Sequence, residues 1–72
     1  MSIIQQLCEI YNCRDKEELF DYIIYLENQG EVYHSLELVK DMVKRDKQKF
    51  ILYYLEEKNV NLEFLKGLIK II

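Results

Sequence analysis

The order of apolar and polar residues predicts a helix at the centre of the chain. Between positions 19 and 26, seven of eight residues are apolar or aromatic, and only Asp21 interrupts them. Asp15 can accept hydrogen bonds from the first free backbone N–H groups, and Glu18 can reach back to complete a capping box. Gly30 can adopt the left-handed conformation that ends a helix. We therefore predict a helix over 15–29, covered on several sides and central to a small core.

Apolar residues recur at helical spacing on both sides of this segment. They predict a first helix over 2–12, with Ser2 as its cap, and a third helix that begins near Val32. The buried side of the third helix is predicted to carry Leu36, Val39, Met42 and Val43.

The third helix either crosses the polar run over 44–49 fully exposed or breaks there, and we predict a break. We expect Asp46 to cap a fourth helix over 47–58 and Asn59 to stop it. A fifth helix over 60–72 completes the chain. Its buried side is predicted to carry Leu62, Leu65, Leu68, Ile69 and Ile72.

These segments predict an all-α fold, a single domain over 1–72 that is a small bundle of about five short helices. Two helical hairpins after an N-terminal helix would fit the pattern, because Tyr25-Leu26-Glu27 recurs as Tyr54-Leu55-Glu56 in the second half. The alternative is an α+β fold with a short hairpin near residues 22–38, since both flanks of Gly30 are rich in β-prone residues.

Charge is distributed unevenly along a chain whose net charge is −3. Residues 1–39 carry two basic and eight acidic side chains, whereas residues 40–72 carry eight basic and five acidic ones. Such asymmetry indicates a partner surface or head-to-tail association. Half of the residues are hydrophobic, so apolar surface is expected to exceed what one small core can cover.

The sequence shows no signal peptide, and its longest apolar run, 50–55, is far too short to span a bilayer. The last helix is amphipathic, with Lys66 and Lys70 on its polar side, but the core needs its apolar residues, so we predict no membrane binding. With only two cysteines, a reducing cytoplasmic location is expected. Cys8 and Cys13 would point about 140° apart on one helix, so they are predicted not to bridge within an intact helix.

The chain lacks the residue patterns of catalysis. His34 is the only histidine, and its neighbour Ser35 is predicted to be a cap or to face solvent. Zinc sites use two close pairs of ligands, whereas Cys8, Cys13 and His34 offer no second pair. No glycine-rich phosphate loop is present. We expect no enzymatic activity, no cofactor and no metal.

A basic segment suggests nucleic-acid binding as the alternative function. Within residues 40–49 five side chains could contact phosphates: Lys40, Lys44, Arg45, Lys47 and Lys49. Against this, the whole chain is acidic, whereas nucleic-acid-binding domains are usually basic.

The preferred interpretation is a non-catalytic protein–protein interaction module. The chain is rich in tyrosine, and tyrosine is common at protein interfaces. The candidate partner-binding residues are Tyr22, Tyr25, Tyr33, Tyr53 and Tyr54. We expect a regulator or inhibitor of another protein, of a viral or mobile-element type, that also forms a homodimer.

Overall fold

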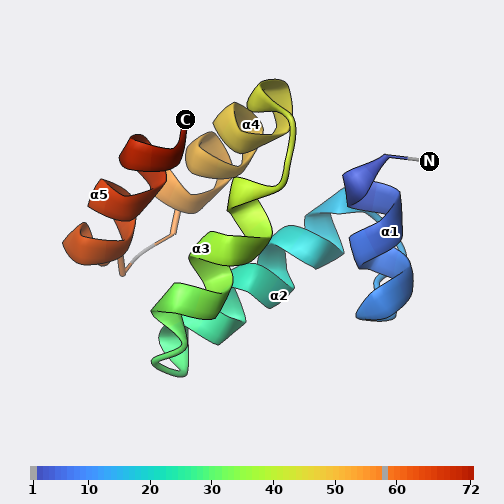
Figure 1. The fold of residues 1–72 in the computed structure, drawn as a ribbon. Helices are drawn as coiled ribbons and strands as arrows, with labels where there is room; N and C mark the ends of the chain where they lie inside the picture. The colour runs from blue at the N-terminus through green and yellow to red at the C-terminus, as the bar shows by residue number, and fades with distance from the viewer. Residues whose placement is uncertain (1, 58) are drawn as a thin grey trace.

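The computed structural model describes residues 2–57 and 59–72, which form five α-helices and no strand (Figure 1). The helices are α1 (Ile3–Ile10), α2 (Lys16–Asn28), α3 (Val32–Lys40), α4 (Lys44–Leu55) and α5 (Leu62–Ile71). The predicted all-α bundle is confirmed. The α+β alternative is wrong, because residues 22–38 belong to α2, α3 and the tight turn between them.

Helix α2 is the element on which the others assemble. It packs against α1, α3 and α4, and Leu19 and Ile23 in its middle are fully buried. Helix α1 lies at one end of the molecule and α5 at the other, with α3 crossing α2 between them (Figure 1). The predicted covering of α2 on several sides is therefore confirmed.

The capping residues of α2 act largely as predicted. The carboxylate of Asp15 accepts a hydrogen bond from the backbone N–H of Glu18 at 2.9 Å, and Gly30 follows the helix with φ +88°. The Glu18 side chain, however, accepts from the backbone N–H and the guanidinium of Arg14, at 3.4 and 3.0 Å. The predicted capping box is thus not formed at α2.

A reciprocal capping box occurs instead at the start of α1. The Ser2 hydroxyl accepts from the backbone N–H of Gln5, and the Gln5 side chain accepts from the backbone N–H of Ser2. Ser2 is therefore the cap that the sequence predicted, and Gln5 is the partner that satisfies a second free donor of the first turn.

The break between α3 and α4 is real but lies earlier than predicted. Helix α3 ends at Lys40, and α4 begins at Lys44 with Val43 as its N-cap. Met42 in the link is buried at 4% exposure, so an apolar anchor holds the turn in place. Asp46 is not the cap: it lies in the first turn of α4, where acidic groups also suit the helix dipole.

Helix α4 ends at Leu55, four residues before Asn59, so Asn59 is not the residue that stops it. The similarity between the two halves of the chain is not a structural repeat either. Tyr25 is 56% exposed while Tyr54 is fully buried, and Leu26 is buried while Leu55 is 48% exposed. The recurring tripeptide therefore presents opposite faces to the core.

The aromatic part of the core joins α4 to α5. The Phe64 ring lies 5.0 Å from the ring of Tyr54 and 6.3 Å from that of Phe50, edge to face in both pairs. Phe50 in turn meets Phe20 of α2, with ring centroids 5.2 Å apart. All three residues of the α4–α5 group are fully buried, and such pairs contribute beyond their buried area.

The buried face of α5 is therefore only partly the predicted one, because Leu68 is buried as expected but Phe64 was not predicted. Phe64 and Leu68 are fully buried, whereas Leu62 and Ile69, predicted to be buried, are 69% and 62% exposed. Gly67 shares the buried face: a Cβ at this position would lie 2.8 Å from Cδ1 of Leu36 on α3. The close approach to α3 and the edge-to-face contacts of Phe64 turn these two sides of α5 toward the core. The more aliphatic side, with Leu62 and Ile69, therefore faces solvent.

Candidate protein-interaction surface

Exposed apolar side chains gather on α4 and α5. Outside these two helices, the exposed large hydrophobic residues of the described chain are scattered. We call the five that lie on α4 and α5, or directly after α5, the α4–α5 stripe: Leu52 (67% exposed), Leu55 (48%), Leu62 (69%), Ile69 (62%) and Ile72 (46%). Half-buried Leu65 lies among them on α5.

Helical geometry places the members of the stripe on common sides of their helices. At about 100° per residue, Leu62 and Ile69 are roughly 20° apart around α5, with Ile72 roughly 60° beyond Ile69. Leu52 and Leu55 are likewise roughly 60° apart on α4. Each helix thus contributes one narrow apolar sector.

The two sectors lie on the outer side of the α4–α5 pair. On α4, Tyr54 contacts α5, and Tyr53 reaches Asp21 of α2, so Leu55 borders α5 on the side away from α2. On α5, Gly67 meets α3, and Ile69 is roughly 160° away from it. Around α5, Leu62 and Ile69 lie roughly 140–160° from Phe64, which contacts α4. The exposed sector of each helix therefore faces outward from the α4–α5 contact.

The five side chains of the stripe leave a large apolar area exposed. Five side chains at these exposures leave on the order of 500 Å² of apolar surface, comparable to the largest patch of a typical monomer, which is often functional. A standard protein–protein interface buries about 800 Å² per partner. The stripe together with its polar border is large enough for such a contact.

The border of the stripe is basic. Helices α4 and α5 carry six basic side chains against two acidic ones, in an otherwise acidic chain. One of the two acids, Asp46, is paired with Lys16 of α2 at 3.3 Å. Lys66 and Lys70 are exposed on α5. A partner surface with an apolar centre and an acidic border would complement this arrangement.

The predicted tyrosine candidates do not form one surface. Tyr54 is fully buried and is not available to a partner. Tyr53 and Tyr22 are half-buried, the latter with its ring 4.8 Å from that of Tyr11. Only Tyr25 and Tyr33 are well exposed, at 56% and 78%. Tyr25 lies on α2 and Tyr33 on α3, so both are outside the α4–α5 stripe.

Tyr54 instead belongs to a buried polar network that the sequence did not predict. Its hydroxyl donates a hydrogen bond of 2.6 Å to the buried carboxylate of Glu27 and accepts one of 2.8 Å from the backbone N–H of Asn61. Burial, reinforced by the bond to Glu27, raises the pKa of Tyr54 to about 12. The network ties α2 to α4 and to the start of α5.

Tyr53 has a second short hydrogen bond, from its hydroxyl to Asp21 at 2.5 Å. This bond and partial burial raise the pKa of Tyr53 to about 12. In a spectrophotometric titration at 295 nm we therefore expect Tyr53 and Tyr54 to remain protonated past pH 11, above the ordinary tyrosine pKa of about 10.

The variants Tyr53→Phe and Tyr54→Phe should each remove one late-titrating group, whereas the control Tyr33→Phe should leave both late-titrating groups in place. Ionisation of all six tyrosines around pH 10 in folded protein, monitored by circular dichroism, would contradict the two hydrogen bonds.

The basic candidates are only partly available. The ammonium of Lys47 donates to the carbonyl oxygen of Ile71 at 2.8 Å and so caps the end of α5. Lys40, Lys44, Arg45 and Lys49 are exposed. Lys16 of α2, which was not among the predicted residues, adds a positive charge near Lys49. The charges of Lys16 and Arg45 lower the pKa of Lys49.

The residues considered for catalysis have structural contacts. Ser35 was predicted to cap a helix or face solvent, and this is wrong: it is fully buried and donates to the carbonyl oxygen of Ile23 at 3.0 Å. Nε2 of His34 lies 3.3 Å from the hydroxyl of Tyr11, and Nδ1 lies 3.6 Å from the Glu31 carboxylate. Within residues 2–57 and 59–72, no three His, Cys, Asp or Glu side chains are grouped to hold a metal ion.

Comparisons with known proteins leave the interpretation to the structure itself: no protein-family model, curated protein or solved structure matches the chain. In the part of the chain that the structure describes, no helix has the length and apolar character needed to cross a membrane.

Proposed function

We propose that this chain is a small non-catalytic protein that acts by binding another protein through the α4–α5 stripe. The observation that carries the proposal is the stripe itself: five large aliphatic side chains, 46–69% exposed, on two neighbouring helices and the residue after them. Leaving such an area in water is unfavourable, and covering it is the main driving force of protein association. A regulator or inhibitor of viral or mobile-element type, acting in the cytoplasm, is the class that suits its size.

Nucleic-acid binding is the second candidate, favoured by the cluster of Lys16, Arg45 and Lys49. These charges could contact phosphates, but the aliphatic stripe beside them has no role in such contacts. A protein partner uses both features, with aliphatic residues at the centre of the interface and the basic groups at its border. The protein interface therefore explains more of this surface.

Self-association is expected where no other partner is present. Two copies related by a two-fold axis could pack their stripes against each other and bury apolar side chains of both, as in common homodimers. Light scattering after size exclusion at micromolar concentrations should give a mass near twice 8.8 kDa, falling on dilution. The double variant Leu52→Lys/Ile69→Lys should remain a monomer with unchanged helicity, because both sites are exposed.

The control for added charge is Ile10→Lys, compared with the single variant Ile69→Lys, because both replace a similarly exposed isoleucine (69% and 62%) and only Ile69 belongs to the stripe. Ile10→Lys should dimerise as the wild type does. A monomeric wild type at 100 μM would contradict self-association. If the control and the stripe variant weakened dimerisation equally, added charge rather than loss of the stripe would explain the effect.

The partner-binding proposal is tested by affinity capture with the wild type, Ile10→Lys and the double stripe variant, with and without nuclease. We expect the wild type and Ile10→Lys to retain a partner protein in stoichiometric amount, and the stripe variant to lose it. Binding of this partner should persist after nuclease treatment and in moderate salt. Capture of nucleic acid alone, lost steeply as salt rises and abolished by Lys16→Ala/Arg45→Ala/Lys49→Ala, would instead support the second candidate.

A further inference from the structure

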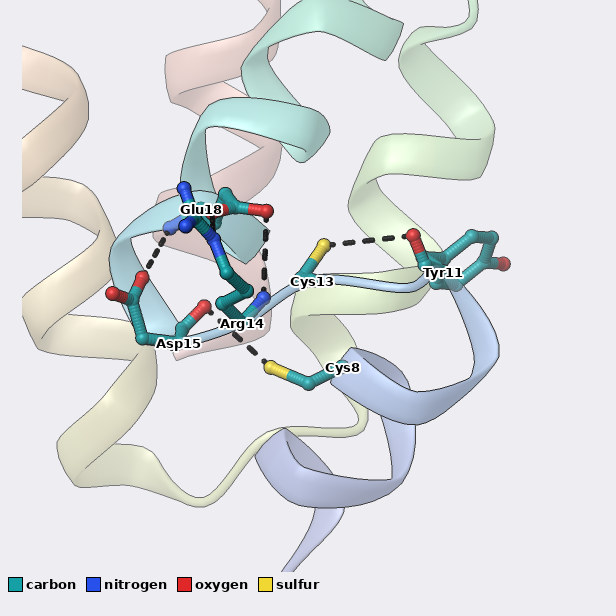
Figure 2. Close-up of polar contacts among 6 residues, drawn as sticks. All are labelled: Cys8, Tyr11, Cys13, Arg14, Asp15 and Glu18. Atoms are coloured by element: carbon teal, nitrogen blue, oxygen red, sulfur yellow. Dashed lines mark hydrogen bonds and ion pairs between the residues drawn. The ribbon is translucent and has the colours of Figure 1, made fainter.

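The two cysteines lie on either side of the turn that ends α1. Helix α1 ends at Ile10, so Cys13 is not on the same helix as Cys8. Asn12, with φ 57°, turns the chain back on itself. The backbone N–H of Cys13 then donates to the carbonyl oxygen of Cys8 at 2.8 Å, the outer hydrogen bond of a Schellman motif. Figure 2 shows the two side chains on this turn.

This hydrogen bond sets an upper limit on the separation of the two Cα atoms. A carbonyl oxygen lies about 2.4 Å from the Cα of its own residue, and a backbone nitrogen about 1.5 Å from its Cα. Added to the 2.8 Å between Cys8 O and Cys13 N, these lengths allow at most about 6.7 Å between the Cα atoms. Disulfides span Cα separations of about 4.4–6.8 Å, so this upper limit lies within the range that a bridge allows.

The two sulfur atoms point toward different carbonyl groups. Sγ of Cys8 lies 3.6 Å from the carbonyl oxygen of Asp15, and Sγ of Cys13 lies 3.8 Å from that of Tyr11 (Figure 2). Both residues are half-buried and line one pocket of about 590 Å³. These S–H contacts are weak, so rotation about the side-chain bonds can bring the sulfurs together while the backbone stays in place.

We propose that Cys8 and Cys13 form an intramolecular disulfide when the protein meets a two-electron oxidant such as a peroxide. Both thiols lose their protons and one electron each as the S–S bond forms. One peroxide is reduced at the same time to two waters, which take up the two protons. The reaction closes a six-residue ring over the end of α1, and thiols such as glutathione reverse it.

The reaction is slow at neutral pH and accelerates in alkali. Burial, together with the charge of Asp15, raises the pKa of the Cys8 thiol, and burial together with Cys8 raises that of Cys13. Because the thiolate is the attacking species, little of either cysteine is reactive near pH 7. The pair is therefore a site that responds to sustained oxidation.

The bridge acts at the joint between α1 and α2. Tyr11, which lies inside the ring, packs on Tyr22 and hydrogen-bonds His34, so it connects α1 to α2 and α3. Closing the ring restricts this joint in the unfolded chain. The oxidised protein should consequently melt at a higher temperature than the reduced protein, with α1 still helical.

The test uses the full chain at low micromolar concentration, treated with hydrogen peroxide at pH 8 and analysed by intact mass spectrometry and non-reducing electrophoresis. The wild type should lose both titratable thiols, fall in mass by about 2 Da and remain a single chain. Dithiothreitol should restore both thiols. The variants Cys8→Ser and Cys13→Ser should show no loss of 2 Da and should add oxygen or form covalent dimers.

Two results would overturn the proposal. One is a wild type that adds oxygen at each cysteine independently, without losing 2 Da. The other is a wild type that forms covalent dimers as readily as the two single variants do. Loss of the stripe has no bearing on this chemistry, so Leu52→Lys/Ile69→Lys should form the disulfide at the wild-type rate.

Discussion

Replacing Phe64 by alanine is expected to remove much of the free energy of unfolding, about 3–5 kcal/mol. Phe64 is fully buried and makes edge-to-face contacts with Phe50 and Tyr54, so truncation leaves a cavity among rings that cannot collapse freely. A domain of this size has roughly 4–11 kcal/mol in total. Urea unfolding followed by circular dichroism should show a large drop in midpoint, or a chain already partly unfolded.

The control is Leu62→Ala, two residues earlier on the same helix. Leu62 is 69% exposed, so its truncation should change the free energy of unfolding by less than about 1 kcal/mol. The apolar spacing of the sequence alone predicts the opposite order, with Leu62 in the core. If Leu62→Ala proved the more destabilising of the two in dilute monomer, the observed rotation of α5 would be wrong.

The variant Tyr54→Phe is expected to lower the free energy of unfolding by about 2–3 kcal/mol although it removes a single oxygen atom. It leaves the buried Glu27 carboxylate without its donor and the backbone N–H of Asn61 without its acceptor. A buried charge without its partner is costly. The matched control is Tyr53→Phe, whose lost partner Asp21 is exposed and can be solvated by water.

The pH dependence of these variants provides a separate test. The pKa of Tyr54 is about 12 in the folded chain and about 10 when unfolded, so its contribution is fully present below pH 10 and is lost as pH rises toward 12. The difference in stability between wild type and Tyr54→Phe should be constant from pH 7 to 9 and shrink above pH 10. A difference that grows in alkali would refute the assignment.

Local signals explain why the fold class was predictable. Asp15, Gly30 and the apolar run between them mark a helix through short-range hydrogen bonding, backbone conformation and periodicity, all visible in sequence. The face that each helix buries depends on which neighbour it meets. Phe64 is buried because Phe50 and Tyr54 oppose it, and no spacing within 60–72 reveals that.

The candidate site was predictable only in outline. Composition indicated more apolar surface than one core can cover, and the α4–α5 stripe agrees with this expectation. Three of its members, Leu62, Ile69 and Ile72, were predicted to be buried, because exposed and buried aliphatic residues look alike in sequence. The burial of Tyr54 and Ser35 was not predicted for a different reason. Their hydrogen bonds to Glu27 and to Ile23 join parts of the chain that are distant in sequence.

The close approach of α5 to α3 has a consequence for how this sequence can vary during evolution. The chain contains no alanine, so Gly67 provides the tight fit against Leu36 that a small residue usually supplies between helices. An alanine at 67 would place its methyl group 2.8 Å from a methyl group of Leu36. Among natural variants, a larger residue at 67 should therefore accompany a shorter one, such as valine, at 36, and the two positions should change as a pair.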